Sequence, residues 1–244
     1  MKIGVISDIH ANLVALREVL KDMTNEGCEK VICLGDLVLA GPQPKETLDF
    51  IRQQEDWIII QGNTDKLIAD FGSEVLQMME DNFPVMAKAI VDDIAQLTDE
   101  DVEYLKNLPP QVMLDVEDIN ICLVHGSPRA NNEDIMPGMP IEAIEEIVAD
   151  TSSALILCGH THIPCGYQTN NQQTVVNVGS VGRPMTPTPL ACYAIVEVAE
   201  GKFNIKHRFV EYDAMIAADL VHKRGFEGAD MLAELLINPY ARHV

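Results

Sequence analysis

Side chains able to bind divalent metal ions recur between residues 8 and 162, each at the end of an apolar run. The donors are carboxylate, amide and imidazole groups without any thiolate, a mixture that suits borderline ions such as Mn, Fe, Co, Ni or Zn. Seven donors are too many for one ion, but they suit two ions that share a bridging carboxylate. The donors are Asp8, His10, Asp36, Asn63, His125, His160 and His162.

Taken singly, most of these motifs are weak evidence for a metal site. Gly35-Asp36 and Gly62-Asn63 are typical of turns. Asp8-x-His10 is typical of a helix cap or a surface pair, and His125 is equally typical of a hydrogen-bonded core histidine. Gly159-His160-x-His162 is more specific, because two imidazoles at positions i and i+2 near a strand end suit one metal ion. Four of the seven histidines fall in this ordered series, so the combination predicts a site for two metal ions.

Short apolar runs alternate with helical patterns along the chain, and this alternation predicts a layered α/β domain. In such domains ligands bind beyond the carboxyl ends of the strands, where all five donor motifs lie. Residues 191–198 and 203–211 are predicted to form a hairpin through Glu200-Gly201-Lys202. Further strands are expected at residues 3–6, 31–34, 57–60, 119–124, 154–158 and 174–178, and helices at 13–23, at 45–53 and from 213 onward with a break near 225–228.

Residues 65–108 differ from this alternating pattern. They carry helical periodicity, acidic patches and no convincing strand, and Pro109-Pro110 ends them. We predict two or three helices here, inserted into the α/β frame as a cap over the site. No internal repeat or linker divides the sequence, so a single domain over residues 1–244 is expected.

The chain is strongly acidic, since 17 Lys and Arg side chains against 38 Asp and Glu give a net charge of −21. Long-range repulsion of phosphate groups argues against stable binding to nucleic acids or to anionic membranes. No apolar run approaches the ~20 residues that a membrane span needs. An acidic protein that binds a phosphate needs local positive charge, and bound metal is a natural source of it.

The six cysteines show no C-x-x-C spacing, and several lie within apolar runs, as Cys33 does. This pattern is typical of small buried side chains in a reducing compartment. Cys158 and Cys165 flank the histidine motif, so a redox or metal role is the alternative for them. The N-terminus begins with a strand and shows no basic segment followed by an apolar one, so we expect no signal peptide and a cytoplasmic location.

The ordered series of donor motifs resembles that of the calcineurin-like metallophosphoesterase superfamily, over residues 2 to about 198. The stretches that flank the donors are most similar to its small bacterial and archaeal branch, described as diadenosine-tetraphosphatase-like or phosphodiesterase-like. Those stretches are residues 7–13 (SDIHANL), 125–129 (HGSPR) and 176–182 (VNVGSVG).

The resemblance implies a fold and a set of metal ligands. The fold is a four-layer α/β/β/α sandwich, in which two mixed sheets pack face to face between helices. By this resemblance, the first ion is held by Asp8, His10 and His162, the second by Asn63, His125 and His160, and Asp36 bridges both.

The activity that the resemblance implies is hydrolysis of a phosphate ester by a water or hydroxide that bridges the two ions. Mn²⁺ is the favoured metal, with Fe, Zn, Ni and Co as alternatives. Asp36, Asn63 and His125 are the predicted catalytic residues. The expected binding partner is a small phosphorylated substrate. If the protein forms an oligomer, a homodimer is the form we consider.

Thr64 departs from the family pattern, because many members carry there a His thought to protonate the leaving group. A hydroxyl is too weak an acid for that task, so the predicted substrates are phosphodiesters and other esters with good leaving groups. Asp65 is the first candidate for a replacement acid. Phosphomonoesters and dinucleoside polyphosphates are alternative substrates. A non-catalytic scaffold for protein interaction is the alternative from another class, although such relatives typically lack metal ligands that are all present here.

Two polar side chains near the donors are predicted to contact the substrate. Arg129 follows His125 and could pair bidentately with a phosphate, with a surface ion pair as the alternative. Asn12 starts the first helix, where contact with phosphate competes with the usual role of a helix cap. Arg183, after the glycine-containing turn at 179–182, is a weaker candidate.

Overall fold

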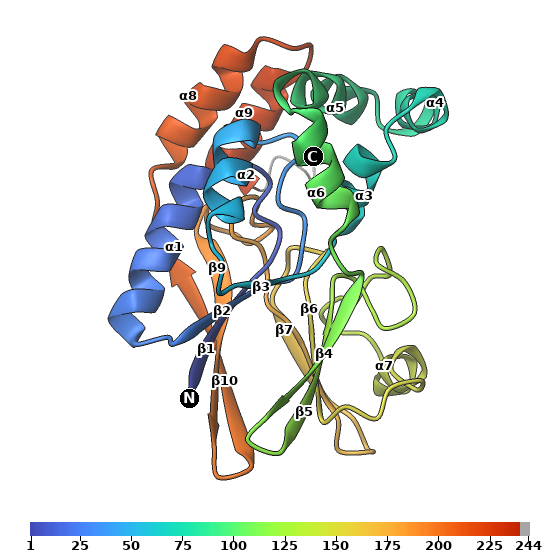
Figure 1. The fold of residues 1–244 in the computed structure, drawn as a ribbon, viewed down its shortest axis with the longest axis vertical. Coiled ribbons are helices and arrows are strands. Elements are labelled where there is room, and N and C mark those ends of the chain that lie inside the picture. The colour runs from blue at the N-terminus through green and yellow to red at the C-terminus, as the bar shows by residue number, and fades with distance from the viewer. Residues whose placement is uncertain (240–244) are drawn as a thin grey trace.

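The computed structural model describes residues 1–239, and within them two five-stranded mixed sheets pack face to face (Figure 1). The first sheet has the order β10 (Lys202–Val210), β9 (Ala191–Ala199), β1 (Lys2–Ile6), β2 (Lys30–Cys33) and β3 (Ile58–Ile59). The second has the order β4 (Gln111–Val116), β5 (Ile119–Val124), β6 (Leu155–Cys158), β8 (Thr174–Asn177) and β7 (Cys165–Gln168). Strands β1, β2 and β3 are parallel, as are β5, β6 and β8, so their carboxyl ends reach common edges.

The core between the sheets follows from the alternation of side chains along each strand. Ile3 and Val5 of β1 point inward and join one buried apolar cluster with Ile121 of the second sheet. Gly4 points outward, where a Cβ atom would lie 2.6 Å from the Sδ of Met23 on the covering helix α1 (Leu13–Glu26). A strand buried on both faces therefore appears in the sequence as a continuous apolar run with one glycine.

Helices cover the outer faces of both sheets. On the first sheet, Ile6 joins a buried apolar cluster with side chains from eight helices. On the second, Ile144 and Ile147 pack against Cys122 beneath α7 (Ile141–Ile147). The eight helices are α1, α2 (Pro44–Arg52), α3 (Asn63–Ala69), α4 (Ser73–Asn82), α5 (Pro84–Gln96), α6 (Asp99–Lys106), α8 (Ala214–Arg224) and α9 (Ala229–Ile237). The predicted four-layer α/β/β/α sandwich is therefore confirmed.

The inserted segment contains four helices, where two or three were predicted. They are α3 (Asn63–Ala69), α4 (Ser73–Asn82), α5 and α6 (Asp99–Lys106). Gly72 separates α3 from α4, and Pro84 starts α5 directly after Phe83 has ended α4. Such short breaks leave the apolar periodicity almost continuous, so the sequence pattern merges neighbouring helices. Helix α3 also begins at a predicted metal ligand, two residues before the predicted insertion.

The sequence pattern misses three elements, the strands β4 and β7 and the helix α7. Strand β4 pairs with β5 through a turn at Glu117 and Asp118, whose φ values are 46° and 68°. Its side chains alternate between half-buried and exposed, as at Met113, so its apolar signal is weak. The other predicted strands are confirmed, and so is the tail of two helices with its break at Gly225 to Gly228.

Within residues 1–239, no helix is both long enough and apolar enough to cross a bilayer.

Candidate metal centre

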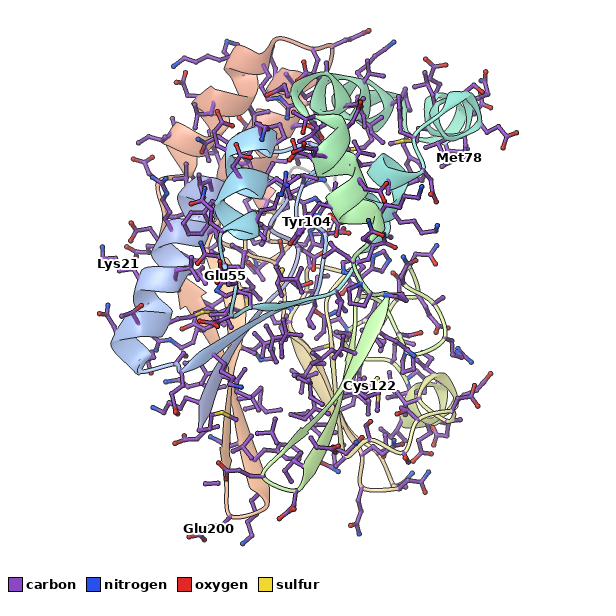
Figure 2. All side chains as sticks on the ribbon, in the orientation of Figure 1. Lys21, Glu55, Met78, Tyr104, Cys122 and Glu200 are labelled. Carbon is purple, nitrogen blue, oxygen red and sulfur yellow. The ribbon has the colours of Figure 1, made fainter. Side chains whose placement is uncertain are left out.

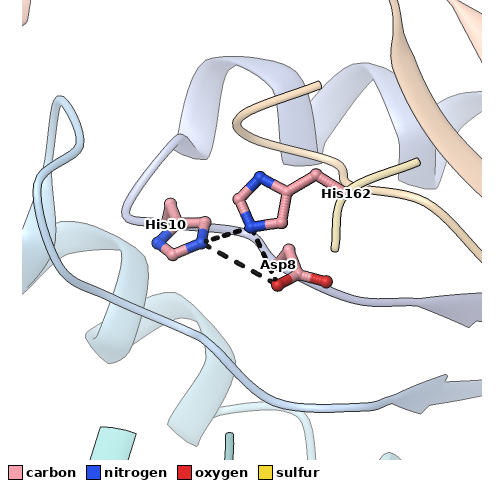
Figure 3. A group of neighbouring side chains, drawn as sticks. All are labelled: Asp8, His10 and His162. Atoms are coloured by element: carbon pink, nitrogen blue, oxygen red, sulfur yellow. Dashed lines mark hydrogen bonds and ion pairs between the residues drawn. The ribbon is translucent and has the colours of Figure 1, made fainter. Parts of the chain in front are cut away.

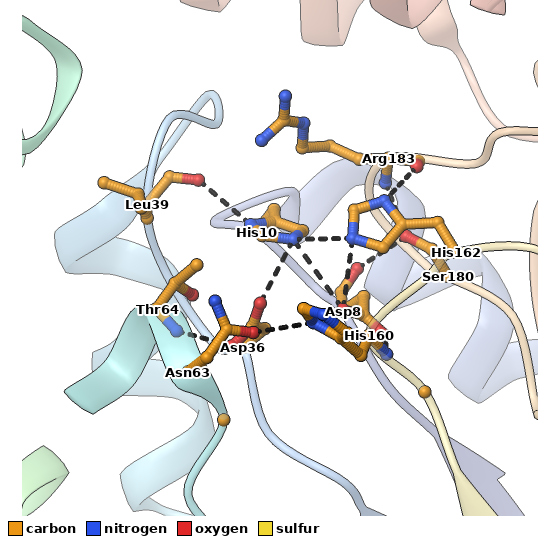
Figure 4. A network of polar contacts seen from close by, with 12 residues as sticks. Asp8, His10, Asp36, Leu39, Asn63, Thr64, His160, His162, Ser180 and Arg183 are labelled. Carbon is orange, nitrogen blue, oxygen red and sulfur yellow. Dashed lines mark hydrogen bonds and ion pairs between the residues drawn. The ribbon is translucent and has the colours of Figure 1, made fainter. Parts of the chain in front are cut away.

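The structure brings all seven predicted donors together at one end of the paired sheets, and Figure 4 labels all of them except His125. Six donors lie on loops that leave the carboxyl end of a parallel strand, as expected for α/β folds, and Asn63 is the first residue of α3, which follows β3. Asp8 and His10 follow β1, Asp36 follows β2, Asn63 follows β3, His125 follows β5, and His160 and His162 follow β6.

The backbone turns sharply at most of these donors. Five of them have left-handed φ values, which residues with a side chain adopt at a cost of about 1–3 kcal/mol each. The loops hold one another in this conformation, since the backbone amide of His10 donates to the carbonyl of Asp36 (2.9 Å). The φ values are 54° for Asp8, 45° for His10, 56° for Asp36, 69° for His160 and 62° for His162.

Two of the glycines that precede donors are required by close packing. A Cβ atom on Gly62 would lie 2.3 Å from the backbone nitrogen of Asp36, and one on Gly159 would lie 2.0 Å from the Oγ of Ser7. Both distances are shorter than any real contact of a Cβ atom. The Gly-Asn and Gly-His motifs therefore allow two donor loops to touch at the site.

Asp8, His10 and His162 form a compact first group (Figure 3). The Nε2 atoms of His10 and His162 lie 3.1 Å apart, and the Oδ1 of Asp8 lies 3.1 Å from the Nε2 of His162 and 3.9 Å from that of His10. All three side chains are buried. Two imidazole nitrogens and one carboxylate oxygen thus converge on one point, as the ligands of a metal ion do.

A second group forms around Asn63. Its Oδ1 lies 2.9 Å from the Nε2 of His125 and 2.8 Å from the Nδ1 of His160. Asp36 faces both groups, because its Oδ1 lies 3.4 Å from the Nε2 of His125 and its Oδ2 lies 3.6 Å from the Nε2 of His10. One carboxylate therefore stands between two sets of donors.

Backbone carbonyls orient three of the imidazoles. The Nδ1 atoms of His10, His125 and His162 each lie within hydrogen-bond distance of a carbonyl oxygen, at 3.2, 2.7 and 2.7 Å. When Nδ1 donates to a carbonyl, the lone pair of Nε2 is directed into the site, which is the arrangement usual for metal-binding histidines. His160 is reversed, because its Nδ1 faces Asn63 and its Nε2 lies 3.3 Å from Asp134.

The electrostatics of the site fit a bound cation. The Oδ1 of Asp8 is buried and has no hydrogen-bond partner among the described residues, which is costly for a carboxylate. Burial opposes ionisation of Asp36, but the neighbouring His125 and His10 outweigh it and hold the pKa of that carboxyl well below its usual range. Burial, His162 and Arg183 lower the pKa of His10 to about 3, so this imidazole is neutral and able to bind a metal.

Asp65 has a structural role that differs from the acid role considered for it above. Its carboxylate accepts hydrogen bonds from the backbone amides of Gly62 (2.9 Å), Asp36 (2.8 Å) and Leu37 (2.9 Å). It is fully buried, and burial together with the nearby Asp36 raises its pKa to about 7. Asp65 thus ties the loops after β2 and β3 to each other, and its oxygens face these amides. Asp65 stands three residues after Gly62, the spacing of a capping box, and this spacing is a sequence signal that could have indicated such a contact.

The hydroxyl of Thr64 is also used within the loops. It donates to the carbonyl of Val38 (3.3 Å), while the Thr64 amide donates to the Oδ1 of Asp36 (2.9 Å). The residue at the position of the absent histidine therefore supports the carboxylate of Asp36.

The two residues predicted to contact substrate have other partners in the structure. The guanidinium of Arg129 bonds to Glu133 and lies 3.6 Å from Glu146, as in the ion-pair alternative. Asn12 caps α1 by accepting from the Ala15 amide, and its side-chain amide donates to Gly182. Substrate contact by Arg129 and Asn12 stays a prediction.

Arg183 lies closer to the donors. Its carbonyl accepts from His162, and its side chain extends past His10 (Figure 4). Its positive charge helps to lower the pKa of His10. The structure therefore places this guanidinium at the first group of donors.

Comparison with known proteins agrees with this geometry. The model of the calcineurin-like phosphoesterase superfamily domain matches residues 1–201. An uncharacterised protein of Methanocaldococcus jannaschii is 29% identical over 235 residues, which cover 91% of this chain and 92% of that protein. A metallophosphoesterase from Sphaerobacter thermophilus has a similar crystal structure (TM-score 0.79, 26% identity), with 97% of this chain and 98% of that one covered. A hypothetical protein from Pyrococcus horikoshii shares the fold (TM-score 0.86, 24% identity) with the same coverage.

Proposed function

The chain belongs to the calcineurin-like phosphoesterase superfamily, and from that premise we propose that it hydrolyses phosphodiesters, or other phosphate esters with good leaving groups, with the help of two divalent metal ions. The observation that carries the proposal is the position of Asp36. Its two oxygens face different imidazoles, at 3.4 Å from His125 and 3.6 Å from His10. A single carboxylate between two groups of donors is what two neighbouring ions require.

The grouping of the donors supports a specific assignment of ligands. Two bound ions would lower the pKa of an attacking water and neutralise charge on the phosphoryl oxygens. Oxygen and imidazole donors suit Mn²⁺, which we favour, and they also suit Fe, Zn, Ni or Co. One ion would be held by Asp8, His10 and His162, the other by Asn63, His125 and His160, with Asp36 shared by both.

The residues around this centre have separable tasks. Carbonyl groups hold the imidazoles of His10, His125 and His162 with Nε2 toward the site, so little reorganisation is needed when ions bind. Arg183 brings a positive charge to the His10 side, where it can attract the phosphate of an ester. In a protein with a net charge of −21, such local positive charge is needed for an anionic substrate.

The choice of substrate rests on Thr64. Because its hydroxyl donates to the Val38 carbonyl and is a weak acid, Thr64 gives no assistance to a leaving group. Proton donation by a placed side chain is usually worth about 10²–10⁴-fold in rate. Esters whose leaving groups depart without a proton are therefore the proposed substrates. Membership of the diadenosine-tetraphosphatase-like branch stays a prediction.

The test measures metal content and hydrolysis on one preparation. Protein stripped with EDTA should contain no metal and should hydrolyse no bis(p-nitrophenyl) phosphate, and Mn²⁺ should restore both. The restored protein should hydrolyse this diester much faster than phosphoserine. Full activity in a sample shown to be metal-free would refute the proposal, and so would equal rates on phosphoserine and the aryl diester.

A further inference from the structure

A cavity of ≈ 480 Å³ opens directly beside the metal centre, and we call it the insertion pocket. Two of its lining residues, Asn63 and His160, are also donors of the centre. The remaining walls come from α3, α4, the residue that ends α4, and the loop after β5. These wall residues are Lys66, Leu67, Asp70, Val75, Met78, Phe83, Asn131 and Asn132.

Several residues that line the insertion pocket are apolar, and two of them are exposed. Phe83 is 58% exposed and Met78 is 40% exposed. Figure 2 shows Met78 on α4, at the outer edge of the inserted helices. Exposed apolar side chains that meet in a concave site beside a reactive centre are typical of ligand recognition. Phenylalanine and methionine in particular pack well against flat rings.

The other residues that line the insertion pocket are mostly polar, and together they carry little net charge. Asn131 and Asn132 each offer one amide that donates and accepts hydrogen bonds. Lys66 is bound to Asp70 (2.5 Å), so its positive charge is compensated within the pocket. The insertion pocket therefore offers no net positive charge to bind a further phosphate group. It does offer apolar side chains to pack against a neutral ring and amides to bind the polar edge of that ring.

We propose that the insertion pocket binds the nucleobase of a nucleoside phosphoester, with the ring against Phe83 and Met78 and its edge toward the asparagine amides. This inference rests on the proposed function, because Asn63 and His160 place the pocket next to the site of the phosphate. It assigns a task to the inserted helices, since α3 and α4 then determine which organic group the enzyme accepts.

The test compares two ligands that differ only in the base. Isothermal titration of the Mn²⁺-loaded protein measures the binding of adenosine 5′-monophosphate and of ribose 5-phosphate, with chromatography to show that both ligands survive. We expect the adenosine ligand to bind at least about tenfold more tightly, the gain usual for one stacked base. Phe83→Ala and Met78→Ala should each weaken its binding by about fivefold and leave ribose 5-phosphate unchanged.

Phe209→Ala is the matched control, because Phe209 is 49% exposed on β10 and lies outside the pocket. Circular dichroism checks the fold of each variant. Equal binding of the two ligands would overturn the inference, and so would variants that weaken both ligands equally. The two proposals can fail separately. If the protein binds the adenosine ligand more tightly but does not hydrolyse the diester, the proposed phosphodiesterase activity is refuted and the proposed base-binding site stands. If it hydrolyses the diester but binds both ligands equally, only the base-binding site is refuted.

Discussion

Substitution of Asp36 by asparagine should remove one metal ion and keep the fold. The Oδ1 of Asp36 accepts from the Thr64 amide (2.9 Å), a bond that the oxygen of an asparagine can retain. The amide nitrogen would then replace Oδ2, which lies 3.6 Å from the Nε2 of His10. A protonated amide nitrogen cannot bind a metal, so the ion on the His10 side should be lost first.

The expected magnitude follows from the separations in the site. The carboxylate oxygens of Asp36 lie 3.4 Å from the Nε2 of His125 and 3.6 Å from the Nε2 of His10, and each of these nitrogens would bind one of the two ions together with Asp36. At such a distance, one unit charge interacts with another by on the order of 5 kcal/mol at an effective dielectric constant near 20. Loss of this charge should therefore weaken binding of the nearer ion by more than about a thousandfold.

Metal content and thermal unfolding measure the effect together. Wild-type protein should hold two ions per chain after Mn²⁺ loading and desalting, and the Asp36→Asn variant should hold one. Each ion at a hundred times its dissociation constant adds about 2.7 kcal/mol of stability. For a domain of this size, that corresponds to roughly 5–11 °C in Tm. The variant should lose about half of the total increase in Tm that Mn²⁺ gives the wild type.

Two comparisons make this prediction refutable. Asp219→Asn changes an exposed aspartate of α8 in the same way and should retain both ions and the full increase in Tm. In the Asp36→Asn background, His160→Ala should abolish the remaining ion, whereas His10→Ala should not. Two retained ions in Asp36→Asn would refute the shared ligand, and loss of the remaining ion with His10→Ala would refute the order of loss.

Three further predictions concern the loops and the arginines. Asp65→Asn replaces one of the two oxygens that together accept from three backbone amides by an NH₂ group, which leaves at least one amide without its acceptor. We therefore expect a loss of about 1–3 kcal/mol of stability in urea unfolding, and an unchanged midpoint would contradict the tie between the loops. Gly62→Ala would place a Cβ atom 2.3 Å from the Asp36 nitrogen, so metal content should fall together with Tm, and wild-type values of both would show that the loops can separate. Arg183→Ala should raise the KM for an aryl diester more than Arg129→Ala does, because Arg129 is paired with two glutamates. If steady-state kinetics show the reverse order, Arg129 rather than Arg183 contacts the substrate.

Local sequence determined the central strands and the identity of the donors. Residues 31–34 are apolar throughout because β2 is covered on both faces, and this requirement acts on each residue directly. Gly27 ends α1 because its φ of 77° suits glycine. Parallel strands bring their carboxyl ends to one edge, so donors that follow such strands can be predicted to meet. For these reasons the seven donors and a layered α/β domain could be predicted from local pattern, whereas the four-layer sandwich was implied by the family resemblance.

Only the tertiary structure decided which of several alternative partners a polar side chain binds. Arg129 has a phosphate and carboxylates as alternative partners, and only the fold shows that Glu133 and Glu146 lie within reach. Asp65 could serve as an acid or as a tie between loops, and three amides brought to it by β2 and β3 select the second.

The inserted helices show the same limit. Their apolar residues have one period whether they face a core or a cavity, so the pattern could not separate α4 from α5 or show that Met78 and Phe83 stay exposed. Periodicity reports that a side chain is apolar, but its burial depends on which element packs against it. That choice is made by contacts between segments far apart in the chain, and no local pattern records them.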